Sequence, residues 1–384
     1  TAIFANYMRK LYLFNPENDM ALASGSFYYM PPASAKKMAA DLSTLPVWYA
    51  ERESAVLLAD SRQVEWLRET GFFPLKVDGV LEIPAETFEI VPWGWSPALL
   101  HRLGKDGMRD DVEVIRKLSS RKMAVDLLPE LRLENTVGES FWFTTLEGVS
   151  MFALKHGKVL LKAPWSGSGK GIQPLCGQPD DNLKGWIKRV IASQGGVVGE
   201  PFYHKVKDFA MEFSVSSGKA VFVGYSLFEA DARGIYKENL LASDEAIEGI
   251  LGNYISRELL KDIRARLLDK LSLWYGTDYH GYLGVDMMVV QTEGGYVLHP
   301  CVEINVRMNM GVVARLFFDR YVSREAYGRY CIEYYPCQGE ALCFHEEMKR
   351  KYPLCLHEGK IKEGYLSLTP VFEDTNYQIY VILQ

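Results

Sequence analysis

The sequence lacks the features that mark specialised classes of protein. It has only six cysteines in 384 residues and no CxxC pair, which argues against a disulfide-stapled scaffold and predicts reduced thiols. No uninterrupted apolar run reaches 18 residues, so no membrane-spanning helix is expected. The net charge is only −6, which argues against a large basic surface for a phosphate backbone. We therefore expect a cytoplasmic protein whose partners include neither nucleic acid nor a membrane.

The composition that remains is typical of a globular protein with sizeable cores. Hydrophobic residues make up 48% of the chain and charged residues 24%. At ~150 residues per domain, the length predicts two to three domains. The order Met8-Arg9-Lys10 leads us to expect that the protein's own sequence starts at Met8, with residues 1–7 as an extension.

The pattern of apolar runs changes along the chain. In the first 115 residues, short apolar runs alternate with helical patterns, which is typical of a parallel α/β layer. In this part of the chain we predict a helix at 61–70 and strands at 11–14, 46–49, 55–58 and 88–91. Further helices are predicted at 112–130, 138–156, 181–194, 244–275 with a break at Gly252, and 311–329. Closely spaced strands indicate an antiparallel α+β region; they are predicted at 158–163, 172–175, 197–203, 209–215, 220–227, 282–290 and 295–304.

A glycine-rich loop at 166–171 is the first chemical signal. Glycines let backbone N–H groups approach a phosphate closely. The P-loop pattern is not met, because Pro164 stands where a glycine is required and Gly171 where a Ser or Thr is required. A strand-like run follows the loop, whereas the dinucleotide-binding pattern needs a helix there. The segment is either a phosphate flap, preceded by a strand that carries Lys162, or a flexible hairpin tip.

Polar residues alternate along the second of two strong predicted strands. Glu303, Asn305 and Arg307 are spaced by two, so their side chains share one face of the strand. A hairpin would bring Asp286 of the preceding strand beside them. Carboxylate and amide oxygens suit Mg²⁺, and an arginine beside them could hold a phosphoryl group or an oxyanion. The alternative is a solvated strand face with an ordinary ion pair.

In their order and spacing, these segments resemble the ATP-grasp superfamily across roughly half of the chain. The matching segments are 119–122, 160–164, 166–171, 197–202, 207–212, 284–286 and 303–307. The resemblance implies a mixed α/β and α+β fold, with a Rossmann-like N-terminal layer, a two-lobed ATP-grasp domain and a short C-terminal extension. The corresponding domains are 8–115, 116–196 for the lobe with the glycine flap, 197–330 for the lobe with the metal site, and 331–384.

The resemblance also implies how ATP would be bound. Lys122 and Lys162 would contact its phosphates. Glu200 and Phe202 would hold adenine, and Asp208 would bind the ribose hydroxyls. Asp208 is shorter than the glutamate that is usual there, so Glu212 is the alternative. The glycine flap would close over the phosphates with Ser166, Gly167, Ser168, Gly169 and Gly171.

The same resemblance implies a metal and a catalytic group. Asp286, Glu303 and Asn305 would bind one or two Mg²⁺ ions. Arg307 would stabilise the developing charge, with Lys162 as its catalytic partner.

Candidates for binding the other substrates are less specific. Side chains that follow strands of the N-terminal layer, or that lie in a loop before Asp286, could line a ligand crevice; they are Asn15, Asn18, Asp19, Trp93, Trp95, Arg233 and Lys237. The alternatives are turn chemistry and helix capping for the asparagines and aspartate, and solvated charges for Arg233 and Lys237.

The expected activity follows from the resemblance. It is an ATP-dependent ligase that uses Mg²⁺ to activate a small-molecule carboxylate as an acyl phosphate for attack by an amine or a thiol, with carbon–nitrogen bond formation favoured. A small-molecule kinase on the same fold and a non-catalytic nucleotide-binding module are the alternatives. A homodimer is possible, and the sequence does not identify the substrates.

Overall fold

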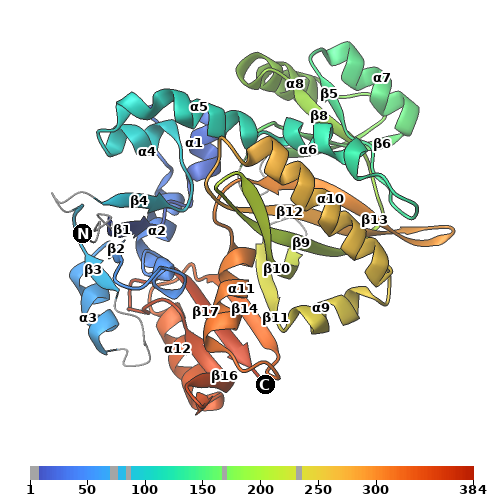
Figure 1. Ribbon diagram of the computed structural model, residues 1–384. Coiled ribbons are helices and arrows are strands. Elements are labelled where there is room, and N and C mark those ends of the chain that lie inside the picture. Colours follow the sequence, from blue (N-terminus) through green and yellow to red (C-terminus); the bar gives the residue numbers. More distant parts are fainter. Residues whose placement is uncertain (1–7, 70–76, 84–87, 167–170, 231–235) are drawn as a thin grey trace, which may run out of the picture.

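The computed structural model describes residues 8–69, 77–83, 88–166, 171–230 and 236–384 (Figure 1). Within these residues the strands form three sheets. The N-terminal sheet is parallel throughout, in the order β3 (Asp78–Val80), β2 (Ala55–Leu57), β1 (Lys10–Leu13), β4 (Glu89–Pro92). Its helices are α1 (Asn18–Ser24), α2 (Ala33–Asp41), α3 (Ser61–Glu69) and α4 (Pro97–Arg102). The predicted Rossmann-like layer is confirmed.

The small sheet lies at the upper right of Figure 1. Its order is β5 (Phe141–Phe143), β8 (Val197–Pro201), β6 (Lys158–Lys162), β7 (Ile172–Cys176), and all its pairs are antiparallel. The helices α7 (Leu146–His156) and α8 (Asp181–Gln194) pack with it around a core of their own. This unit carries both Lys162 and the ends of the glycine loop.

The long sheet runs through the centre of the molecule. Its order is β13 (Gly295–Asn305), β12 (Gly281–Thr292), β9 (Lys205–Ser216), β10 (Lys219–Ala230), β11 (Tyr236–Leu241), β14 (Gly328–Tyr334), β17 (Tyr377–Leu383), β16 (Lys360–Ser367), β15 (Cys355–His357). The pairs are antiparallel, as the α+β prediction requires.

Two helices pack against the long sheet, and their contacts show which strand side chains face the helices and which face the opposite side. One is α10 (Arg257–Tyr275), whose core cluster includes Leu283, Val285 and Met287 of β12. The side chains of the intervening residues, Asp286 among them, therefore face the other side of the sheet. The other helix, α11 (Met310–Tyr321), packs with residues of the N-terminal layer in a second core. No helix of the described residues is long and apolar enough to cross a membrane.

Two predicted elements in the first half of the chain are wrong. The expected strand at 46–49 is a 3₁₀ helix, Leu45–Trp48. Pro46 lies in its first turn, where the missing N–H of proline costs nothing. The predicted helix at 138–156 contains β5 and only then α7, which begins after Thr145, whose side chain accepts a hydrogen bond from the Gly148 N–H.

Two further predicted helices are shorter than expected. The helix at 112–130 is divided into α5 (Arg109–Leu118) and α6 (Arg121–Leu127), because the Ser120 hydroxyl caps a new helix. The short η2 (Asp106–Met108) and η3 (Leu128–Leu131) flank this pair. The helix predicted at 311–329 ends at Tyr321, where extended backbone follows at Val322. The break at Gly252 is confirmed, between α9 (Asp244–Leu251) and α10.

Residues 331–384 continue the long sheet. Their strands β15–β17 and the helix α12 (Glu340–Lys351) follow β14, which pairs with both β11 and β17. The predicted boundary at 330/331 falls within β14, and that at 115/116 falls within α5. The division into four domains stays a prediction.

Candidate active site

The predicted acidic row lies where β9, β12 and β13 run side by side. Asp286 of β12 is directly opposite Glu303 of β13, and Gly284 is opposite Asn305. The Asn305 amide donates a hydrogen bond to Asp286 Oδ2 at 3.0 Å. The structure therefore brings together the three side chains that the sequence singled out as Mg²⁺ ligands.

Burial makes this row electrostatically unusual. Burial, followed by the charge of Glu303, raises the pKa of Asp286 to about 7. Burial also raises the pKa of Glu212 to about 8, although the Asn309 amide donates to its carboxylate at 2.9 Å. Glu212 lies opposite Gly284, where a Cβ would come within 2.5 Å of Glu212 Oε2. A side chain at position 284 would displace the Glu212 carboxylate and the Asn309 amide from their present places, which favours glycine there.

The donors of this row fit Mg²⁺ and do not form an all-protein cage. The carboxylates of Asp286 and Glu303 lie on directly opposite residues of the two strands. Asn305 would add its carboxamide oxygen, which here accepts a hydrogen bond from Arg307 at 3.2 Å. Within the described residues no group of three or more His, Cys, Asp or Glu side chains is placed to hold a metal ion. Mg²⁺ usually takes one or two carboxylates and completes its shell with water and substrate phosphates. Asp286, Glu303 and Asn305 are therefore a suitable partial shell.

Lys162 and Glu200 form a buried ion pair between adjacent strands of the small sheet. The Lys162 Nζ to Glu200 Oε2 distance is 2.6 Å, and each side chain is only 5% exposed. Ser140 adds a hydrogen bond to the other oxygen of Glu200 at 3.3 Å. The pair places a fixed cation at the end of the strand that leads into the glycine loop.

Arg121 is a site residue that the sequence analysis missed. Its Nη1 donates to the Ala163 carbonyl at 2.7 Å and to Ser166 Oγ at 2.6 Å. Its Nη2 contacts Glu303 at 2.9 Å. The side chain is 5% exposed, so one buried guanidinium joins α6, the start of the glycine loop and a candidate metal ligand.

Lys122 faces away from this cluster. Its ammonium is paired with Asp126 one turn along α6 at 2.5 Å, and both side chains are almost half exposed. Ser120 is a typical N-cap residue, so the sequence carries a signal for where α6 begins. The start of the helix determines which of the adjacent residues Arg121 and Lys122 points inward.

We expect Arg121→Ala to weaken binding of a Mg²⁺·ATP analogue at least tenfold, and Lys122→Ala to weaken it less than threefold. The first change removes a buried cation beside Glu303, whereas an exposed ion pair contributes only about 0–1 kcal/mol. Calorimetric titration of both variants, with Asp126→Ala as the control, measures the difference. Equal weakening by the two variants would contradict this assignment.

The glycine loop is described only at its two ends. The Ser166 hydroxyl oxygen accepts a hydrogen bond from Arg121. The Gly171 carbonyl accepts a hydrogen bond from the Ala163 N–H at 2.8 Å, which closes the β6–β7 hairpin. A Cβ on Gly171 would lie 2.3 Å from Ser166 Cβ, so glycine is required there. Gly167, Ser168 and Gly169 lie outside the described residues.

The remaining nucleotide candidates differ in exposure. Asp208 is ion-paired with Lys205, and burial raises its pKa against the opposing effect of that lysine. Asp208 lies opposite Met288, which is two residues after Asp286 on β12. Phe202 is 38% exposed, and the Lys158 ammonium is 3.5 Å from its ring centroid. Phe202 thus lies at the surface beyond β8, while Asp208 lies on the site face of β9.

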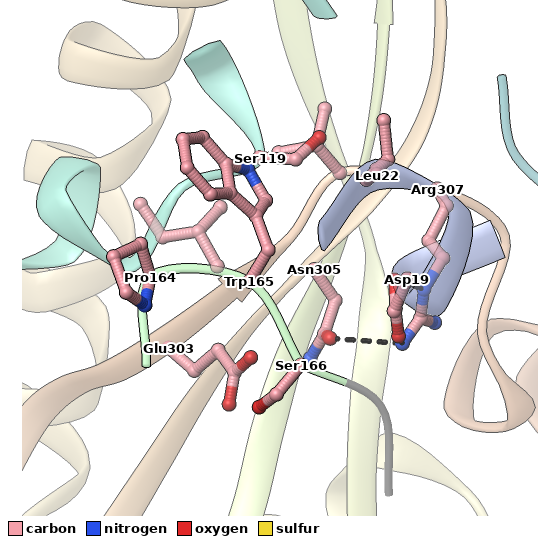
Figure 2. A pocket seen from close by; sticks show the side chains of 11 residues that line it. Asp19, Leu22, Ser119, Pro164, Trp165, Ser166, Glu303, Asn305 and Arg307 are labelled. Atoms are coloured by element: carbon pink, nitrogen blue, oxygen red, sulfur yellow. Dashed lines mark hydrogen bonds and ion pairs between the residues drawn. The ribbon is translucent and has the colours of Figure 1, made fainter. Parts of the chain in front are cut away.

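Arg307 and Asp19 meet across the interface between the N-terminal layer and the long sheet. Arg307 Nε donates to Asp19 Oδ1 at 2.8 Å and its Nη2 to Asp19 Oδ2 at 2.6 Å. Burial opposes the charge on Arg307, but Asp19 and the nearby acids outweigh it and raise the pKa of Arg307 above its ordinary value. Figure 2 shows this pair beside Asn305, on the wall of a cavity of about 20 Å³ that Glu303 and Ser166 also line.

The other substrate candidates in the N-terminal layer hold two loops together. Asn15 donates to the Gly94 carbonyl at 2.8 Å, and Asn18 donates to the Trp95 carbonyl at 2.8 Å. Trp93 is buried, with Phe14 packed edge-on at 4.9 Å. Both tryptophans also line a cavity of about 670 Å³ between β4 and the ends of β9 and β12. The two asparagines join these loops through their side-chain amides, and their part in substrate binding stays a prediction.

Of the two basic candidates before Asp286, the structure describes only Lys237, which is not brought into the acidic row. Lys237 is exposed on β11, three strands from β12 in the long sheet. Arg233 lies outside the described residues.

Comparison with known proteins gives a result at the level of structure. No protein-family model matches the sequence, and no curated protein matches it either. Biotin carboxylase from Campylobacter jejuni, solved as a beta-gamma-ATP complex, has a TM-score of 0.55 and 12% identity, covering 98% of this chain and 87% of that one. The biotin carboxylase domain of the Hydrogenobacter thermophilus 2-oxoglutarate carboxylase, solved with MgADP, ADP and bicarbonate, has a TM-score of 0.53 and 12% identity, over 99% of this chain and 87% of that one.

A third similar structure is named as a synthetase and not as a biotin carboxylase. N5-carboxyaminoimidazole synthetase from Staphylococcus aureus, solved with ADP, has a TM-score of 0.50 and 10% identity, with 98% of this chain and 93% of that chain covered. Identities this low bear on the fold and leave the substrates open. The similarity extends over nearly the whole chain and includes the parallel N-terminal sheet followed by antiparallel sheets. The chain therefore has the fold of the ATP-grasp enzymes.

Proposed function

We propose that this protein is an ATP-dependent ligase that activates a small-molecule carboxylate as an acyl phosphate for attack by an amine or a thiol. Carbon–nitrogen bond formation is the favoured outcome. The observation that carries the proposal is the meeting of two basic side chains with the facing carboxylates Asp286 and Glu303. Arg121 is ion-paired with Glu303, and Arg307 contacts Asn305 beside them.

The arrangement suits phosphoryl transfer to a carboxylate. Such a step needs charge neutralisation and alignment more than a side-chain nucleophile. Lys162 would hold a phosphate of ATP, and Glu200 keeps its ammonium in place. Arg121 would fix Glu303 relative to the start of the glycine loop, and Arg307 would bind an oxyanion beside Asn305.

A metal ion has a defined place in this proposal. Asp286, Glu303 and Asn305 would hold Mg²⁺, which would neutralise phosphate charge when bound. Glu200 and Phe202 would hold adenine and Asp208 the ribose, with Glu212 as the alternative acid. The solved structures named above contain beta-gamma-ATP, ADP or MgADP, which supports a nucleotide in the corresponding part of this fold.

The test is an assay of ADP and phosphate release over a matrix of carboxylates and amines. A ligase releases both products only when Mg²⁺·ATP and both co-substrates are present. ADP release with the phosphate retained on a hydroxyl of one substrate would replace the ligase by a kinase. Failure of a non-hydrolysable ATP analogue to bind, with and without co-substrates, would reject both.

A further inference from the structure

The cavity of about 670 Å³ that both tryptophans line continues the strand face that carries the acidic row. Its lining includes Ser214 of β9 and Tyr282 of β12, which lie opposite each other. The pair Glu212 and Gly284 follows two residues further along these strands. Side chains two residues apart share one face of a strand, and two residues span roughly 7 Å. The cavity therefore begins about one small molecule's length from the acidic row, and its volume is typical of small-molecule sites.

Aromatic rings from three parts of the fold line this cavity. Trp93 and Trp95 follow β4, and Tyr282 lies on β12. Tyr12 lies on β1 and packs edge-on at 5.8 Å against Tyr49, which follows the 3₁₀ helix Leu45–Trp48. A ring in the ligand gains edge-to-face or offset contacts with such walls, which a saturated group of the same size does not make.

Two of the tyrosine hydroxyls are left without partners. Within the residues that the structure describes, neither Tyr49 nor Tyr282 has a hydrogen-bond partner for its hydroxyl. Tyr49 is only 4% exposed, so bulk water does not replace the missing partner. Buried polar groups are normally hydrogen-bonded, and an unpaired one indicates a place that a ligand or an ordered water can fill.

Arg320 of α11 adds a positive charge at the same end of the cavity. Its Nη1 donates to the carbonyls of Trp48 and Ala50, at 3.4 and 3.0 Å, and these two residues flank Tyr49. Burial raises the pKa of Tyr282, and the charge of Arg320 opposes this shift, which places the guanidinium near that hydroxyl as well. Two hydroxyl donors and one cation thus face a cavity whose other walls are largely aromatic.

We propose that this cavity binds the aromatic ring of one co-substrate, and that Tyr49, Tyr282 and Arg320 hold a hydrogen-bond acceptor on the far side of that ring. This inference rests on the proposed function and names a substrate class for it, an arylalkyl acid or an arylalkyl amine. The reacting group would lie toward the acidic row, because Val306 lines both this cavity and the small cavity beside Glu303.

Two matched series of probes test the ring and the acceptor separately. The acids are 3-(4-hydroxyphenyl)propionate, 3-phenylpropionate and 3-cyclohexylpropionate; the amines are tyramine, phenethylamine and 2-cyclohexylethylamine. Each is titrated calorimetrically into the wild type, with and without a non-hydrolysable Mg²⁺·ATP analogue. In one series we expect the phenol to bind roughly tenfold more tightly than the cyclohexyl compound, with the phenyl compound between them. The series that responds identifies the reacting group as an acid or an amine.

Variants locate the binding site in this cavity. Tyr49→Phe and Tyr282→Phe should each weaken binding of the phenol by roughly three- to tenfold and leave binding of the phenyl compound unchanged. Tyr335→Phe is the matched control, because Tyr335 is also buried and its hydroxyl also lacks a partner, but it does not line the cavity. Ser214→Phe should abolish binding of every probe, because the new ring fills the cavity.

Four results would overturn the inference. In both series the phenyl and cyclohexyl compounds bind equally, or no probe of either series binds. Tyr49→Phe and Tyr335→Phe have the same effect on the phenol. If the tyrosine variants do not fold, Ser214→Phe decides alone, and unchanged binding of the probes to it rejects the cavity as the site.

The same titrations distinguish this inference from the proposed function. Binding of the ATP analogue without a response to any probe rejects the aromatic substrate class and leaves the ligase proposal standing. A response to the probes that Ser214→Phe removes, without binding of the analogue to the wild type, keeps the aromatic site and rejects the ATP-dependent function.

Discussion

We expect Asp286→Asn to lower Mg²⁺-dependent ATP turnover by roughly a hundredfold or more. The substitution keeps the shape of the side chain and removes one of the two carboxylate charges that would hold the metal ion. Steady-state ADP release measured over a range of Mg²⁺ concentrations reports the loss and should show a higher Mg²⁺ requirement.

The same substitution should leave the free energy of unfolding unchanged or increase it. Asp286 is partly buried opposite Glu303, and both desolvation and the Glu303 charge raise its pKa and so disfavour its ionised form. Loss of turnover together with retained stability therefore points to metal binding and away from misfolding. Asp126→Asn, at an exposed pair, is the control. Unchanged turnover in Asp286→Asn would remove the metal assignment.

Lys162→Met should weaken binding of a Mg²⁺·ATP analogue by roughly a hundredfold, because the ammonium is the charged group held at the end of β6. It should also destabilise the fold by about 3–5 kcal/mol, because Glu200 is left as an unpaired buried charge. Calorimetry measures the first effect and urea unfolding the second.

A double variant separates these two effects of Lys162. In Lys162→Met/Glu200→Gln neither member of the pair is charged, so most of the lost stability should return. Binding of the ATP analogue should not return with it. If the double variant binds the analogue as tightly as the wild type does, Lys162 is a structural residue and its assignment to ATP is incorrect.

The parts of the site that lie on neighbouring strands could be predicted from the sequence. Glu303 and Asn305 share a face because a strand has a period of two, and a short turn to the previous strand is enough to place Asp286 opposite Glu303. These are local relations, which side-chain alternation determines. The order of segments then indicated the fold, which the structural comparisons support.

The parts that depend on distant contacts could not be predicted in this way. Asp19 and Arg307 are separated by 288 positions in sequence, and no periodicity connects them. Lys122 was chosen over Arg121 because the resemblance implies a lysine there, whereas the direction of each side chain depends on where α6 begins. The apolar run at 46–49 had a strand-like composition, but its proline and its packing against α11 favour a 3₁₀ helix.

The strand order of the long sheet also has a consequence for biosynthesis. Strand β17 fills the place between β14 and β16, although its residues, Tyr377–Leu383, are translated after those of the other strands in the sheet. Trp48, near the start of the chain, donates its indole hydrogen bond to the carbonyl of Leu368. Until residues 368–383 have been made, a nascent chain therefore leaves the edge of β14 unpaired and the Trp48 indole without the Leu368 carbonyl. Unpaired strand edges of this kind promote aggregation, so yield during expression should depend on translation rate and on chaperone supply.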